Sequence, residues 1–546
     1  GGFGPPGCRF ESCWGLFKMP RYLIITESPK KAKTIKSILK SGNYLVISSK
    51  GHVVDLPKKS FGVYIDNKNE VIIKYIPTKK SFLNYIKKIK NKFKEIIIAT
   101  DPDREGEFIS WSIVNFAKLQ KYSRVRFYEI TKNGIFKGLK NKEKINENLV
   151  NAQKARRVLD RIIGYTLSPI LWKQKIGESA GRVQSSALRL IVEREEEIKN
   201  FKPEIFYKLE VDFGNFKAYL VKNKKSLFPK DQLNILEKIK KEIEGDDFIL
   251  KEITKKERAI KKPTPIDTAL LQRISFLKYK FPSSLTMQLA QSLYEKGLIT
   301  YHRTDSFNLS NEFLAKVKEY IKDYFENPRK IKAKFSQEAH EAIRPTYLKK
   351  DLALNSLEEK LYQLIFDFTL SACSKNAIVG EISYLLSPTK NVNLNFEAKG
   401  EKLVFDGFLK FYPFKISFKE LPPLEKGTLL KPKQIKILEI KTQPPSRYTE
   451  STLIKKLKEL GIGRPSTYAE IIKTLLKRGY VIKEKGYLKP TEKGIIVINF
   501  LKERFKEIVD LKFTANMEEY LDKIAKGEKD YQKYIVDFWN FLKSLL

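Results

Sequence analysis

The sequence predicts a multidomain protein of the α/β and α+β classes, and three patterns lead to that prediction. Near the N-terminus, two apolar runs of strand length each lead through acidic residues into a helix, as in a parallel α/β sheet. Polar and apolar residues alternate with a period of two in residues 206–250 and again in about 377–441, and a mostly helical block separates these stretches. Beyond Lys441, two helices and a short hairpin follow one another, which is a winged-helix pattern.

The composition indicates a polyanionic partner. The 546 residues include 105 Lys and Arg against 64 Asp and Glu, so the formal net charge is +41, and the basic residues extend along the whole chain. Such a charge attracts nucleic acid, although a Lys-rich composition can also serve solubility alone. Aromatic residues make up 12% of the chain, which is enough for ordered cores and also provides surfaces on which bases can stack.

Cysteine usage and hydropathy predict a reducing, cytoplasmic location without a membrane anchor. The three cysteines, Cys8, Cys13 and Cys373, form neither a disulfide framework nor a four-cysteine zinc site. No apolar run reaches the roughly 18 residues of a membrane helix. Residues 1–18 differ in composition from the rest and lack the pattern of a signal peptide, so we expect a disordered tail with Met19 as the natural start.

The two strand–turn–helix units predict a cluster of acids. YLIITE (22–27) leads into a helix that begins near Pro29, and EIIIATD (95–101) leads through PDREGE into a helix from Phe108. Because the carboxyl ends of parallel strands meet at one edge of a sheet, we expect four carboxylates to lie together. They are Glu27, Asp101, Asp103 and Glu105.

Carboxylates at such close spacing favour a bound cation, and hard oxygen ligands favour Mg²⁺. The alternative is a solvated acidic loop. Lys31 lies one turn into the first helix, where it could contact phosphate, protonate a leaving oxygen, or simply lie on the surface.

The next segment is predicted to form a long helix with one basic face. Lys154, Arg157 and Arg161 share a side of this helix, with Asp160 beside them, and the opposite side is apolar. A basic stripe of this kind can follow a phosphate backbone. It can also be a solvated face stabilised by pairs of Arg156 or Arg157 with Asp160.

The segment LITYHRTDSFNLS (298–310) contains the candidate nucleophile. It places Tyr301 two residues before Arg303, directly after a helix predicted to end at Gly297. The unperturbed pKa of tyrosine is about 10, so a nucleophilic tyrosine needs nearby cations. A guanidinium matches phosphate oxygens well, which makes phosphate the expected target. Taken alone, a Tyr-x-Arg triplet is more often a half-buried ring beside a solvated charge.

Two further features concern the C-terminal helices and the histidines. STLIKKLKELG and PSTYAEIIKTLLKRG are predicted helices joined by GIGR, with Ser466 or Thr467 capping the second. The chain has three histidines, His52, His302 and His340, and none has a Cys or second His at metal spacing. We interpret them as phosphate or hydrogen-bond partners, with simple packing as the alternative.

Taken together, these segments strongly resemble the type IA DNA topoisomerases, most closely the bacterial topoisomerase I branch. Eight segments occur in the family's order between Ile24 and Ala469, which is far more specific than any one of them. They are IITESPKKAKTI, SSKGHVVDLP, ATDPDREGE, ARRVLDRIIGY, SAGRVQS, LITYHRTDS, AHEAIRPT and RYTESTLIKKLKELGIGRPSTYA.

The resemblance implies a toroidal core with a Toprim domain, a β-rich hinge arch, a helical tyrosine domain and a winged-helix-like base. The expected boundaries are 1–18 for the tail, 19–130 for the Toprim domain, 131–205 with 445–546 for the base, 206–262 with 388–444 for the hinge, and 263–387 for the tyrosine domain.

The resemblance also implies roles for individual residues. Tyr301 matches the nucleophile, Arg303 its neighbouring arginine and Lys31 a catalytic lysine, while Glu27 and His340 match further catalytic positions. The expected Mg²⁺ ligands are Glu27, Asp101, Asp103 and Glu105. The positions that match DNA contacts of the family are His52, Arg157, Asp160, Arg161, Ser179, Arg182 and Gln184. We add Trp172 and Arg464 to the expected DNA contacts from the sequence alone.

The implied activity is ATP-independent relaxation of negatively supercoiled DNA by a monomer. One strand would be cut in a single-stranded segment through a 5′-phosphotyrosine, and the other strand passed. The alternatives are a topoisomerase III-like decatenase, the topoisomerase part of a split reverse gyrase, and a DNA-binding protein without activity. His302 in YHRTDS also occurs in reverse gyrases, but there is no Walker A motif here. No cysteine follows Cys373, so the C-terminal zinc modules of many relatives are not expected.

Overall fold

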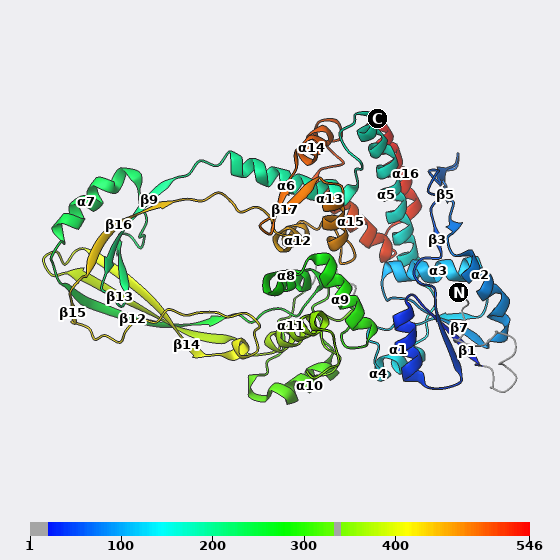
Figure 1. The fold of residues 1–546 in the computed structure, drawn as a ribbon, viewed down its shortest axis with the longest axis horizontal. Coiled ribbons are helices and arrows are strands. Elements are labelled where there is room, and N and C mark those ends of the chain that lie inside the picture. The colour runs from blue at the N-terminus through cyan, green and yellow to red at the C-terminus, as the bar shows by residue number, and fades with distance from the viewer. Residues whose placement is uncertain (1–19, 332–339) are drawn as a thin grey trace.

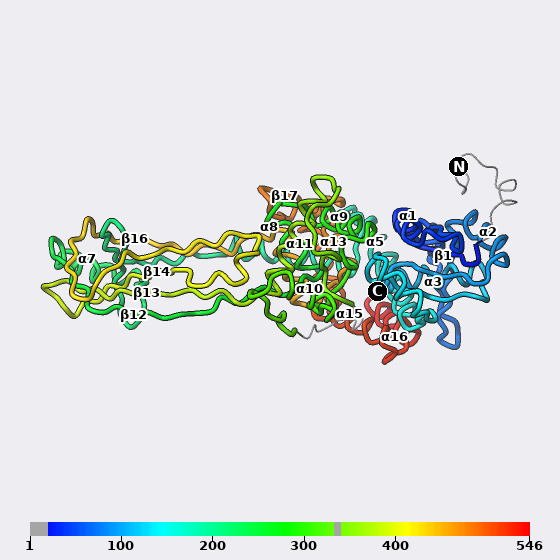
Figure 2. The backbone as a smooth tube through the Cα atoms, turned by 90° about the horizontal axis from the view of Figure 1, so that it is seen from below, coloured from blue at the N-terminus to red at the C-terminus, as the bar shows by residue number. Residues whose placement is uncertain are grey.

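The computed structural model describes residues 20–331 and 340–546, so the expectations for residues 1–18 and Met19 lie outside the described residues. The chain forms a ring in which a long arch of strands leaves a helical body and returns to it (Figure 1). Seen from the side, the arch is much narrower than the body (Figure 2). The predicted toroidal architecture is therefore confirmed.

The N-terminal α/β domain is built on strands β1 (Tyr22–Thr26), β2 (Tyr44–Ser48), β7 (Glu95–Ala99) and β8 (Tyr122–Arg124). They form one sheet in the order β2-β1-β7-β8, and every pair is parallel. Leu23 and Ile25 enter one hydrophobic core and Ile24 enters another, which explains the continuous apolar run of a strand that is buried on both faces.

The helices of this domain are α1 (Pro29–Leu39), α2 (Lys80–Ile89) and α3 (Arg104–Ala117). The next helix, α4 (Lys132–Lys140), follows the predicted end of the domain at residue 130 but packs against α1. Two small two-stranded sheets, β3 (Val54–Asp55) with β6 (Ile76–Pro77) and β4 (Val63–Ile65) with β5 (Val71–Ile73), and the 3₁₀ helix η1 (Lys90–Lys92) complete the domain. Thr26 and Ala99 are register partners, so the acids that follow these two strands meet at the same sheet edge.

The arch is an antiparallel sheet of eight strands. They are β9 (Ile205–Asp212), β10 (Lys217–Val221), β11 (Phe228–Pro229), β12 (Phe248–Ile260), β13 (Ala377–Pro388), β14 (Asn395–Phe405), β15 (Leu429–Leu430) and β16 (Gln434–Lys441), with α7 (Leu233–Glu242), η2 (Lys230–Gln232) and η4 (Gly407–Lys410). β13 pairs with β12 and β14 along its length, so the second half of the arch begins at Ala377 rather than at residue 388. The predicted boundary at residue 388 falls at the last residue of β13, so it assigns a strand of the arch to the tyrosine domain.

The tyrosine domain consists of α8 (Thr268–Tyr279), α9 (Ser283–Glu295), α10 (Asn311–Ile321), η3 (Lys322–Tyr324) and α11 (Ser356–Ala372). α9 ends where the sequence predicts. Gly297 adopts a positive φ of 76°, which an L side chain rarely tolerates, and it turns the chain toward Tyr301.

The base combines α5 (Glu147–Lys173), α6 (Arg182–Lys199), α12 (Glu450–Glu459), α13 (Tyr468–Lys477), β17 (Val481–Glu484), β18 (Tyr487–Pro490), α14 (Glu492–Arg504), α15 (Leu511–Ala525) and α16 (Tyr531–Ser544). The predicted helix–turn–helix and hairpin are present. The predicted N-cap position of α13 is confirmed at Thr467, but the side chain of Thr467 makes no cap hydrogen bond. Its hydroxyl instead accepts from Arg464 N and donates to Arg464 O, which tightens the preceding turn. Within the two described ranges, no helix is both long enough and apolar enough to cross a membrane.

Candidate active site

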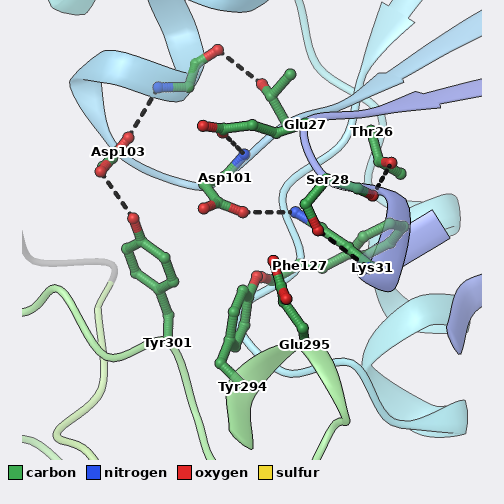
Figure 3. A network of polar contacts seen from close by, with 12 residues as sticks. Thr26, Glu27, Ser28, Lys31, Asp101, Asp103, Phe127, Tyr294, Glu295 and Tyr301 are labelled. Atoms are coloured by element: carbon green, nitrogen blue, oxygen red, sulfur yellow. Dashed lines mark hydrogen bonds and ion pairs between the residues drawn. The ribbon is translucent and has the colours of Figure 1, made fainter. Parts of the chain in front are cut away.

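Tyr301 lies at the seam between the tyrosine domain and the α/β domain. Its backbone N–H donates to Tyr128 O at 2.8 Å, and its phenol donates from Oη to Asp103 Oδ2 at 2.7 Å (Figure 3). Only 3% of the residue is exposed. Two domains therefore hold the phenolic oxygen beside the carboxylates that follow the first two central strands.

The electrostatics of the seam keep this phenol protonated. Burial and the negative charges of Asp103 and Asp101 raise the pKa of Tyr301 well above its usual value, and the guanidinium of Arg303 only partly opposes them. Arg303 Nη1 lies 3.6 Å from Asp103 Oδ2 and 3.3 Å from Glu105 Oε2. A reaction at Tyr301 thus needs both a proton acceptor and added positive charge.

The predicted acids do come together. The backbone N–H of Asp101 lies 3.5 Å from Glu27 Oε2, and Lys31 Nζ donates to Asp101 Oδ1 at 2.9 Å (Figure 3). Burial and the neighbouring carboxylates of Asp101, Asp103 and Glu105 raise the pKa of Glu27 well above its usual value, against the opposing charge of Lys31.

Asp101 and Glu105 are held ionised by neighbouring side chains. Burial alone would raise the pKa of Asp101, but the charge and hydrogen bond of Lys31 outweigh it, and the pKa is lowered. His52 Nε2 lies 2.8 Å from Glu105 Oε1, and this hydrogen bond is the main reason that the pKa of Glu105 falls to about 2. The cluster therefore contains carboxyls with raised and with lowered pKa values side by side.

The negative charge of these acids suits a bound cation, although their side chains do not form a closed coordination shell. Carboxylates close enough to raise the pKa of Glu27 create a site that a divalent cation would stabilise. Across residues 20–331 and 340–546, no three Asp, Glu, His or Cys side chains converge as metal ligands. In this conformation Asp101, Asp103 and Glu105 are engaged instead by Lys31, Tyr301 and His52.

Two buried histidines flank Tyr301. The ring of His340 meets the ring of Tyr301 edge-on at 6.1 Å, and its Nε2 lies 2.9 Å from Pro102 O, so the ring donates through Nε2–H. Burial lowers the pKa of His340 to about 4, and burial together with Arg303 lowers the pKa of His302 to about 3. Both rings are neutral at physiological pH.

We expect acidification to weaken the seam through His340. Its pKa is lower in the folded protein than the value of about 6.5 in an unfolded chain, so its stabilising contribution is present above about pH 6.5 and is lost as the pH falls toward 4. From about pH 7 to about pH 5, the wild type should lose about 2 kcal/mol more than His340→Gln, which cannot titrate. Hydrogen exchange of peptides from Leu298 to Ser310 at several pH values measures this difference, and parallel pH profiles for the two proteins would contradict the expectation.

Tyr294 is a site residue that the sequence analysis missed. It lies on α9, its Oη donates to Phe127 O at 2.6 Å, and its ring packs edge-on against Tyr301 at 5.1 Å (Figure 3). The ammonium of Lys31 lies 5.7 Å from the centre of the same ring. The only sequence signal was its place in the last turn of the helix that leads to Tyr301, and that place does not identify its partners.

A groove of about 810 Å³ contains most of the basic face predicted on α5. Arg157 pairs with Asp55, and Arg161 donates to Pro57 O at 3.0 Å. Trp172 is 59% exposed at the groove's edge, and its indole N–H donates to Glu178 O. The predicted DNA-contacting residues that line this groove are Arg157, Asp160, Arg161, Trp172 and Ser179.

Arg182 does not open onto the groove. Its guanidinium is fully buried, with Nη1 donating to Glu518 Oε1 at 2.6 Å and Nε donating to Asp160 Oδ1 at 3.4 Å. This burial does not favour a direct contact of Arg182 with DNA in this conformation. Gln184 Nε2 donates weakly to Ser179 O at 3.5 Å, and Arg464 lies in a different, smaller pocket near Tyr301.

Comparison with known proteins places this geometry among related chains. A family model described as DNA topoisomerase matches residues 144–536, and a model of the Toprim domain matches residues 22–130. The chain is 42% identical over 531 residues to the DNA topoisomerase 1 of Aquifex aeolicus (strain VF5), which covers 94% of this chain and 97% of that relative. The full-length topoisomerase I of Thermotoga maritima superimposes with a TM-score of 0.85 at 36% identity, covering 96% of this chain and 90% of that structure.

Proposed function

The chain belongs to the type IA DNA topoisomerases, and we propose that it relaxes negatively supercoiled DNA without ATP through a covalent link to Tyr301. The observation that carries this proposal is the hydrogen bond from Tyr301 Oη to Asp103, which joins the tyrosine domain to the acid cluster across a separable seam. The named relatives are a topoisomerase 1 and a topoisomerase I, and they do not favour a decatenase or the topoisomerase part of a split reverse gyrase. A monomeric state and a cytoplasmic location stay predictions.

The proposed reaction exchanges one phosphate ester for another. Tyr301 Oη bonds to the phosphorus of a single-stranded segment while its proton passes to Asp103, which already accepts that proton's hydrogen bond. The bond from phosphorus to the 3′-oxygen breaks, leaving a 5′-phosphotyrosine and a 3′-hydroxyl. Since the ester energy is kept, the 3′-hydroxyl can reverse the attack without a nucleotide cofactor.

Charge and proton supply come from residues already placed at the seam. Arg303 and Lys31 offset the negative charge that develops on the phosphate. Burial and the neighbouring carboxylates raise the pKa of Glu27, which makes Glu27 a candidate proton donor to the leaving 3′-oxygen, with Lys31 as the other candidate. His340 is neutral and anchors the seam through Pro102.

Mg²⁺ is the cofactor that the acid cluster would hold, through Glu27, Asp101, Asp103 and Glu105. When bound, it would neutralise these carboxylates and act as a template for the DNA phosphates. The contacts of Lys31 and His52 keep two of the acids ionised, which is the state that a cation requires.

The groove along α5 offers a route for the single strand toward Tyr301. Arg157 and Arg161 provide positive charge along it, and exposed Trp172 provides a flat ring for stacking. His52, another expected DNA contact, is hydrogen-bonded to Glu105 of the acid cluster.

The gate is proposed to open at the seam while the arch flexes. The seam is closed by hydrogen bonds from Tyr301 N, Tyr294 Oη and Thr34 Oγ1 to backbone carbonyls of the facing domain. Gly297 lies against the facing domain, because a Cβ atom there would lie 2.2 Å from Ile130 O. A side chain at this position would therefore hold the two domains apart.

We expect Gly297→Ala to slow strand cleavage on the order of 100-fold, about 2.7 kcal/mol of barrier, by displacing Tyr301 from the acids. Gly245→Ala is the matched control, because Gly245 has a φ of 74° and open space around it. It should carry the same backbone penalty of about 1–2 kcal/mol without affecting cleavage. Cleavage of a labelled single-stranded oligonucleotide measures both variants, and equal rates for the two would exclude a role for the Ile130 contact.

Plasmid relaxation tests the proposed function as a whole. Negatively supercoiled plasmid should be relaxed with Mg²⁺ and without ATP, and a chelator should stop the reaction. Denaturation during the reaction should trap protein on the 5′ end of the cut strand. After digestion, the attached nucleotide should be found on the peptide that contains Tyr301. Attachment to a 3′ end, or to another residue, would refute the mechanism. Linked catenanes offered beside supercoiled plasmid test the decatenase alternative.

A further inference from the structure

Asp522, on α15 of the base, joins two arginines from distant parts of the chain. Its carboxylate accepts from Arg464 Nε at 3.2 Å and Nη2 at 2.6 Å through Oδ2, and from Arg104 Nη2 through Oδ1. Asp522 is 8% exposed, so both ion pairs are largely shielded from water. This carboxylate is one of the points at which the base contacts the α/β domain.

Arg464 is a fixed part of the base. Its Nη1 donates to Gly461 O at 3.0 Å and to Gly463 O at 2.7 Å, while Nε and Nη2 donate to Asp522. The guanidinium therefore ties the turn between α12 and α13 to α15. Asp522 is held on one side by this rigid partner, and its other oxygen is directed at Arg104.

Arg104 is the first residue of α3 and lies between two acids of the site. Asp103 caps that helix by accepting from Gly106 N at 2.8 Å and accepts from Tyr301 with its other oxygen. Glu105 accepts from His52 and Arg303. Because the guanidinium of Arg104 is held away from this turn, Asp103 keeps its contact with Tyr301 and Glu105 keeps its contacts with His52 and Arg303.

Both arginines line one pocket of about 310 Å³ beside the seam, and its other walls carry charges of both signs. The lining includes Asp103, Arg104, Glu105, Arg156, Arg303, Asp305, His340 and Arg464. Without the negative charge of Asp522, two guanidiniums would face each other in this pocket. Arg104 would then turn toward the nearest carboxylates, Asp103 and Glu105, and compete with Tyr301 and Arg303 for them.

We propose that Asp522 is a positioning residue for the strand-cleavage reaction: it holds Arg104 away from the acid turn, so that Asp103 and Glu105 remain directed at Tyr301 and Arg303. The inference rests on the proposed function, because it assigns Asp522 a part in cleavage at Tyr301. It also links the base, on which the single strand is proposed to lie, to the geometry of the acids.

The test is a double-mutant cycle with Asp522→Asn, which keeps the shape and removes the charge, and Arg104→Ala. Asp522→Asn should slow single-turnover cleavage of a single-stranded oligonucleotide on the order of 10- to 100-fold. Its affinity for that oligonucleotide, measured in a Tyr301→Phe background, should stay within about threefold. The double variant should cleave faster than Asp522→Asn alone and at close to the rate of Arg104→Ala, because the harm comes from a misplaced Arg104. Asp522→Glu should recover part of the rate.

Glu519→Gln is the control on the same helix, since the Glu519 side chain is 50% exposed, and it should cleave at the wild-type rate.

Losses that multiply in the double variant, or a parallel loss of oligonucleotide affinity, would overturn the inference in favour of a general structural role. If Asp522→Asn does not fold, Arg104→Ala and Arg104→Gln still test the inference. Both remove the positive charge without adding a negative one, so both should cleave at close to the wild-type rate, and a loss of cleavage in both would overturn the inference. If the wild type forms no adduct on Tyr301, the proposed function fails together with the inference. If the adduct forms and Asp522→Asn cleaves normally, only the inference fails.

Discussion

Tyr301→Phe is expected to abolish strand cleavage, with a loss of at least about 10⁴-fold. The substitution removes one oxygen from a ring whose packing is otherwise unchanged, because the contacts with Tyr294, His302 and His340 are made by the ring itself. Asp103 would lose a hydrogen-bond donor but would remain beside Arg303. The measurement is the amount of covalent protein–DNA adduct formed with an end-labelled single-stranded oligonucleotide.

Tyr294→Phe provides the matched control for this prediction. Tyr294 is buried in the same cluster and also donates one hydrogen bond through its hydroxyl, to Phe127 O rather than to an acid. This variant should still form the adduct. Adduct formation by Tyr301→Phe, or its loss in Tyr294→Phe alone, would mean that the nucleophile has been assigned to the wrong tyrosine.

Glu518→Ala is expected to destabilise the base by about 3–5 kcal/mol. Glu518 and Arg182 are both fully buried, and Arg182 Nη1 donates to Glu518 Oε1 at 2.6 Å. Burial opposes ionisation of Glu518, but the charges of Arg182, Arg156 and Arg464 outweigh it and lower its pKa, so the pair is ionic. Removing the acid leaves a guanidinium in the interior without its main partner.

Hydrogen exchange of peptides from α6 and α15 measures this loss locally, which is necessary because a ring of several domains does not unfold in one step. Glu519→Ala is the control: its side chain is half exposed and pairs with Lys523 at 2.9 Å. It should change stability by about 0.5 kcal/mol or less. Similar exchange in the two variants would show that the buried pair contributes no more than a surface pair.

Sequence reasoning succeeded where an element and its neighbour in the sheet determine the position of a side chain. The strand runs ending at Glu27 and Asp101 predicted both the parallel sheet and the meeting of the acids, because the two strands are adjacent and in register. Sequence reasoning was less successful with the basic residues. Arg157 and Arg182 have the same charge and lie in equally helical segments, yet Arg157 lines the groove and Arg182 is buried against Glu518.

The sequence by itself determined the order of the elements, the acid cluster at one sheet edge, the end of α9 at Gly297 and the segment that carries Tyr301 and Arg303. These features depend on hydrophobic period, on turn residues and on strand ends, which are local properties of a chain. Only the tertiary structure decided which carboxylate accepts from Tyr301, which arginines Asp522 joins and which charges lie in the interior. Those contacts link residues 58 to 418 positions apart. They are fixed by how whole domains pack against one another, for which no local periodicity carries a signal.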